Sequence, residues 1–80
     1  MKYYVIESTI CDNQQANAIT VRDTLDAALM VYHQIRASAL ANMNVTYNLT
    51  MIVNERGAVY VCEHHGETEE EENTINSDMI

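Results

Sequence analysis

The sequence predicts an α+β fold in which a four-stranded antiparallel sheet carries one long helix packed on one face. Three observations lead to this prediction. Two segments rich in β-branched and aromatic residues come first, one long segment of helix-forming residues follows, and two further strand-like segments come after it. The connections within each pair of strands are short and polar, so each pair is expected to form a hairpin. The expected element order is therefore ββαββ.

The first hairpin is expected between residues 2 and 21. Residues 2–10, KYYVIESTI, have the composition of a pleated, half-buried strand, and residues 17–21, NAITV, have that of a shorter one. The polar segment CDNQQA between them is expected to form the turn. The two strands should then be neighbours in the sheet.

A helix is expected from Asp23 to about Asn42. Asp23 can cap it, and Asp26 lies near its positive end. A projection at about 100° per residue places a broad apolar face toward the sheet. That face contains Leu25, Ala28, Leu29, Val31, Tyr32, Ile35, Ala39, Leu40 and Met43. The opposite side carries small residues that would let a second helix approach. One interpretation is a helix-mediated dimer, and the other is that these alanines only favour helix formation.

Residues 45–54, VTYNLTMIVN, alternate between two kinds of side chain, which predicts a strand with one wet face. One side holds Val45, Tyr47, Leu49, Met51 and Val53, and the other holds Thr46, Asn48, Thr50, Ile52 and Asn54. Gly57 can take the positive φ of a tight turn, after which residues 58–64, AVYVCEH, return as the partner strand.

We expect residues 1–65 to form one domain and residues 66–80 to form a disordered acidic tail. The net charge is −8, and the tail has several acidic residues and no base. Its candidate partner-binding residues are Glu67, Glu69, Glu70, Glu71 and Glu72. Such a surface repels nucleic-acid phosphates and acidic membranes and attracts basic partners, so no direct nucleic-acid or membrane binding is expected. The alternative is that the tail only keeps the protein soluble.

The N-terminal segment has no basic region followed by a long apolar run, and no segment approaches the roughly 20 apolar residues that span a bilayer. We therefore expect a cytoplasmic protein in which Cys11 and Cys62 are free thiols.

Metal and enzyme chemistry are not expected. In the segment VCEHH, strand alternation would send Cys62 and His64 to one face and His65 to the other, and the spacing matches no usual zinc pair. No catalytic motif accompanies the histidines, so we predict no enzymatic activity, no cofactor and no metal.

Arg36 is the most informative single residue, because it falls inside the apolar stripe of the expected helix. One interpretation is that its head only reaches past the sheet edge to water. The other is that Arg36, with Tyr32 and His33, binds an anionic ligand or a second subunit, since guanidinium groups are common at interfaces. His33 by itself is expected to be a boundary histidine that packs its ring.

The string YHQIRASALANMNVTY, continuing into IVNERGAVY, resembles a group of short proteins found in phages and prophages of gut Firmicutes. The likeness covers about residues 1–64. It implies a mobile-element setting in a bacterial host, where small acidic cytosolic proteins often inhibit defence proteins, such as CRISPR-associated nucleases, by binding them.

We therefore expect a non-enzymatic binding protein that engages a host protein through its acidic surface or the wet face of the second hairpin. Two alternatives stay open. One is an oligomer, most simply a dimer, that binds a nucleotide-like anion between its subunits. The other is a structural accessory dimer.

Overall fold

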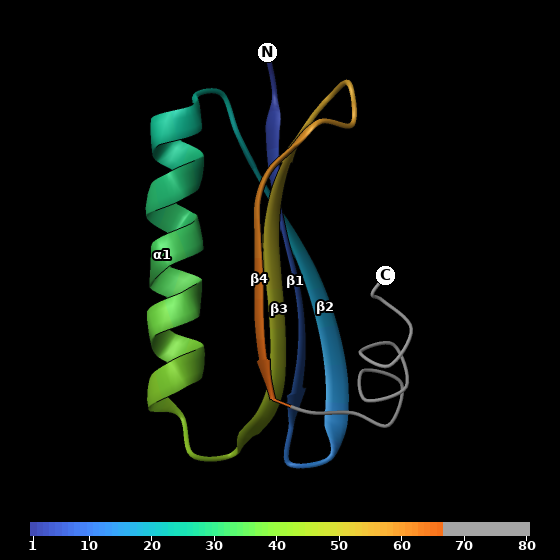
Figure 1. Cartoon of the computed structure of the whole chain (residues 1–80), viewed down its shortest axis with the longest axis vertical. Helices are drawn as coiled ribbons and strands as arrows, with labels where there is room; N and C mark the ends of the chain where they lie inside the picture. The colour runs from blue at the N-terminus through green and yellow to red at the C-terminus, as the bar shows by residue number, and fades with distance from the viewer. Residues whose placement is uncertain (67–80) are drawn as a thin grey trace, which may run out of the picture.

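A computed structural model of the chain describes residues 1–66, which form one antiparallel sheet and one helix (Figure 1). The elements are β1 (Tyr3–Cys11), β2 (Gln14–Arg22), α1 (Leu25–Ala41), β3 (Val45–Asn54) and β4 (Val59–Gly66). The predicted fold class and the order ββαββ are therefore confirmed. Gly66, which the sequence assigns to the predicted acidic tail, belongs to β4, and residues 67–80 of that tail lie outside the described residues.

The sheet order is β2-β1-β3-β4, so the first strand of the chain lies inside the sheet between β2 and β3. Asp12 and Asn13 form the turn from β1 to β2, with φ values of 54° and 65°. Aspartate and asparagine are among the residues that tolerate this left-handed backbone. The turn is therefore shorter than the sequence indicates, and β2 begins at Gln14 rather than at Asn17.

The helix begins after Thr24, not after Asp23. The Thr24 hydroxyl oxygen accepts a hydrogen bond from the Ala27 N–H at 3.1 Å, whereas Asp23 pairs with the Lys2 ammonium at 2.7 Å. Leu40 and Met43 are exposed, so their predicted place on the packed face is wrong. Leu40 lies about 80° from the centre of that face, and Met43 follows the end of α1.

The helix covers one face of the sheet, and the core between the two layers is formed by Val5, Ala28, Tyr32 and Ile52 (Figure 1). The polar side of β3 lies in this layer, where Asn48 and Thr50 are fully buried. The predicted alternation of β3 is thus present. Its wet side, however, is the apolar one, because the helix packs over the side that holds the polar residues.

Candidate interaction surface

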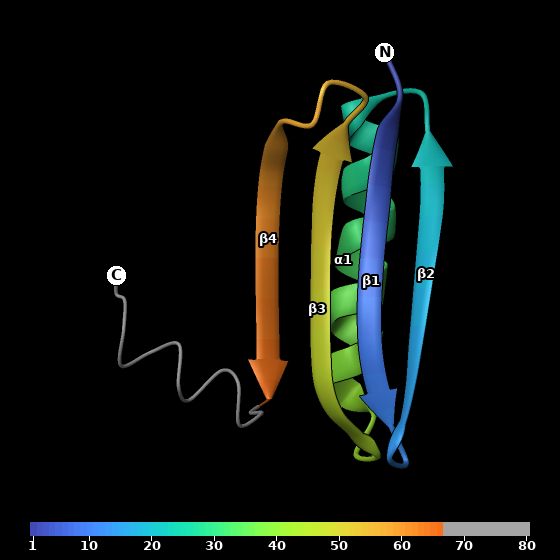
Figure 2. The ribbon, with the colours of Figure 1, turned by 90° about the vertical axis from the view of Figure 1, so that its right-hand side faces the viewer.

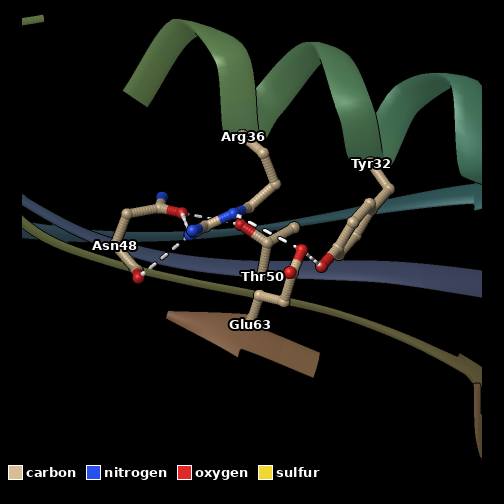
Figure 3. Close-up of polar contacts among 5 residues, drawn as sticks. All are labelled: Tyr32, Arg36, Asn48, Thr50 and Glu63. Carbon is tan, nitrogen blue, oxygen red and sulfur yellow. Dashed lines mark hydrogen bonds and ion pairs between the residues drawn. The ribbon is translucent and has the colours of Figure 1, made fainter. Parts of the chain in front are cut away.

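Arg36 explains how polar residues can lie beneath the helix (Figure 3). Its Nη1 donates to the side-chain oxygen of Asn48 at 2.9 Å and to the Asn48 carbonyl oxygen at 3.4 Å. The Thr50 hydroxyl donates to the same Asn48 side-chain oxygen at 2.7 Å, and the Asn48 amide donates to Thr9 at 2.7 Å. These buried groups therefore have the hydrogen-bond partners that burial requires.

Tyr32 and Glu63 extend this arrangement to β4. The Tyr32 hydroxyl donates to the Glu63 carboxylate, and Glu63 lies 4.0 Å from the Arg36 Nε (Figure 3). Burial, and next the hydrogen bond and negative charge of Glu63, raise the pKa of Tyr32 above its usual value. We name Tyr32, Arg36, Asn48, Thr50 and Glu63 the polar cluster. It joins the helix to β3 and β4.

The structure brings two of the three predicted ligand or interface residues into this cluster. The Arg36 side chain is only 13% exposed, so its guanidinium group is largely buried and does not extend freely into water. His33 is exposed and packs its ring edge-to-face with Tyr32, with 5.4 Å between ring centroids. Ligand or subunit binding by these residues stays a prediction. Sequence reasoning missed Asn48, Thr50 and Glu63. Polar residues at alternate positions of β3 were the signal for Asn48 and Thr50, and β4 has no such alternation at Glu63.

A cavity of about 330 Å³ lies between α1 and the sheet. It is lined by Glu7, Thr9, Gln34, Ile35, Ser38, Ala39, Asn42 and Val45. Its single charged lining residue is Glu7, so a cation or a neutral polar molecule fits its chemistry better than a nucleotide-like anion does. Val45 reaches this cavity because an irregularity opposite Ile10 and Cys11 takes it out of the predicted alternation.

Residues 1–66 contain no group of three or more His, Cys, Asp or Glu side chains placed to hold a metal ion. Within the same residues, α1 lacks the length and hydropathy that a membrane-spanning helix needs.

The face of the sheet turned away from α1 is seen directly in Figure 2, with the helix behind the strands. We name it the open face. Strand alternation and register place these residues on it: Tyr4, Ile6, Ser8, Ile10, Gln15, Asn17, Ile19, Val21, Tyr47, Leu49, Met51, Val53, Val59, Cys62 and His64. None of them is Asp, Glu, Lys or Arg, although these types make up 20% of the chain.

The helix-facing side of the sheet is more polar than is usual for an antiparallel sheet, which commonly turns its apolar side to the core, although Val5 and Ile52 lie on it. On β1, Glu7 and Thr9 face the helix, whereas Ile6 and Ile10 lie on the open face. Ile19 is 64% exposed and Val59 is 58% exposed. Within residues 1–66, α1 packs on the other side of the sheet and covers neither Ile19 nor Val59, so the open face includes exposed apolar side chains.

Comparison with known proteins gives no match: no family model fits the sequence, and no curated protein or solved structure is similar to it.

Proposed function

We propose that this protein is a non-enzymatic binding module that buries the open face of its sheet against another protein chain. The observation that supports it is a continuous, uncharged and largely apolar surface across all four strands. Monomeric proteins rarely expose apolar patches larger than a few hundred Å². The core of a protein interface is poor in charged residues and rich in aromatic residues and methionine, as this face is with Tyr4, Tyr47 and Met51.

The acidic residues supply a second, charge-dependent contact. Residues 1–65 hold four bases and six acids, a net of −2, so −6 of the total of −8 comes from residues 66–80. Charge of one sign steers a partner of opposite sign and sets which partners are excluded. A basic host protein, such as a defence nuclease in the bacterial cytoplasm, is the partner we propose for Glu67 and Glu69–Glu72.

Cys62 is an internal reporter for the first contact, because it is an exposed free thiol on the open face. The experiment measures the rate at which a thiol reagent labels Cys62 in a Cys11→Ser background. Labelling is expected to slow when the protein is concentrated or when an extract of the native host is added. A labelling rate equal to that of an Ile19→Lys variant under both conditions would show that the open face binds no protein.

The matched variants are Ile19→Lys and Ala18→Lys. Both positions are exposed and adjacent on β2, but Ile19 lies on the open face and Ala18 on the other side. Protection of Cys62 should disappear in Ile19→Lys and persist in Ala18→Lys. Loss of protection in both variants would indicate a contact through the edge of β2 instead.

A further inference from the structure

We infer that the chain buried against the open face is a second copy of this protein, packed sheet on sheet. The inference rests on the proposed function, and it names the partner of the same surface. In the dimer, two sheets stack face to face about 10 Å apart, with one helix on each outer side.

The charge distribution favours a second copy over a basic partner at this surface. Each copy carries a net charge of −8, and two such molecules repel one another wherever their carboxylates meet. The open face is where two copies approach without placing any charged side chain in the contact. A basic partner gains nothing from this face, because its ammonium or guanidinium groups would lose water and find no carboxylate there.

The size of the face is sufficient for a specific dimer. Strands lie about 4.8 Å apart and rise about 3.3 Å per residue, so four strands of about eight residues cover roughly 500 Å². Two copies therefore bury on the order of 1,000 Å² in total, which is the lower limit for a specific interface. A symmetric dimer uses the same patch on both subunits, so one such face completes the contact.

The pattern of residues on the face matches the anatomy of an interface. Ile6 and Met51 pair across the two central strands, and they place aliphatic side chains in the middle. Polar residues lie on the outer strands, with Asn17 on β2 and His64 on β4. An apolar centre with a polar rim is the arrangement that excludes water from a contact between proteins.

The test is the mass of the full-length protein by sedimentation velocity over about a hundredfold range of concentration, which mass action makes informative. The wild-type chain is expected to be a dimer. Ile19→Lys and Met51→Lys are expected to raise the dissociation constant at least about tenfold, since they bury an unpaired charge. Each lysine changes the net charge from −8 to −7, so general repulsion cannot explain the loss. Ile19→Lys leaves folding intact because Ile19 is already exposed.

Ala18→Lys is the matched control, and the dimer should survive it. A dimer that persists in both Ile19→Lys and Met51→Lys uses another surface, and the inference is then wrong. A strict monomer whose Cys62 is protected by a host protein also overturns the inference, but it leaves the proposed function standing. Ile75, Met79 and Ile80 are apolar residues of the C-terminal segment, and changing them to serine tests whether the chain covers its own open face. A monomer whose Cys62 labels faster after this change would overturn both proposals.

Discussion

Arg36 on α1 donates a hydrogen bond to the side-chain oxygen of Asn48 on β3 at 2.9 Å, and this contact joins the helix to the fully buried polar side of a central strand. The arginine occupies a position within an apolar stripe for which the sequence allows two interpretations, a head that reaches water and a role in ligand or subunit binding. Because its Nη1 already bonds Asn48, its immediate role in the described structure is to allow the sheet to turn its polar side inward. The apolar side of the sheet is thereby left facing outward.

Replacing Arg36 with methionine keeps most of the apolar stem and removes the guanidinium donors. We expect a loss of about 2 kcal/mol in the free energy of unfolding, because buried acceptors on Asn48 lose a charged partner. Urea denaturation measures the change. Arg56→Met, at an exposed turn position, is the control and should have no measurable effect. Equal stability of both variants would mean that the Arg36 contact contributes nothing.

We expect the folded chain to lose stability at alkaline pH because of Tyr32. Its pKa is raised in the folded chain by burial and by Glu63, so above about pH 10, the ordinary tyrosine pKa, the unfolded chain releases a proton that the folded chain retains. Unfolding is then favoured as pH rises, by about 1.4 kcal/mol per pH unit for this group, and the stabilisation is complete below that range. Denaturant titrations from pH 9 to 11 should show a shallower decline for Tyr32→Phe than for the wild-type chain. Parallel declines would contradict this assignment.

The cap of α1 gives a prediction that separates two adjacent residues. Thr24→Ala removes the hydroxyl oxygen that accepts from the Ala27 N–H, and we expect it to cost about 1 kcal/mol of stability. Asp23→Ala removes only a solvent-exposed pair with Lys2, and such pairs contribute little. Thermal unfolding followed by circular dichroism compares the two variants. A larger loss for Asp23→Ala would restore aspartate as the effective cap.

The two glycines with positive φ differ in their surroundings. A Cβ on Gly66 would lie 2.1 Å from the Thr46 carbonyl oxygen, whereas a Cβ on Gly57 would meet nothing within 4 Å. Gly57→Ala therefore introduces only backbone strain, of about 1 kcal/mol. Gly66→Ala adds a clash with the backbone of β3 and should destabilise the chain more, with faster amide hydrogen exchange at the end of β4. Equal effects would show that β4 ends before Gly66.

The element order could be predicted from the sequence, because composition and alternation are local properties of the chain. The orientation of β3 could not be. Its alternation separates Leu49 and Met51 from Asn48 and Thr50, but the helix packs over the polar pair because Arg36 supplies the charge-assisted bond they need. That bond joins residues 12 positions apart in the sequence. The helical pattern shows that Arg36 lies in an apolar stripe, but it does not identify Asn48 as its partner. Because that contact helps decide which side of the sheet faces outward, the open face could not be predicted from the sequence either.

Salt should act in opposite directions on the two contacts proposed for this protein. Raising the salt concentration from about 50 mM to about 500 mM shortens the distance over which charges act on one another. Two copies with a net charge of −8 then repel each other less, so the dimer dissociation constant should fall. Binding of a lysine-rich peptide, a probe for Glu67 and Glu69–Glu72, should weaken over the same range because it depends on attraction between opposite charges. Sedimentation and fluorescence anisotropy measure the two effects, with Ile19→Lys as the monomeric control for peptide binding. A dimer that weakens with salt would indicate that charged pairs hold it together, and an uncharged sheet face cannot supply them.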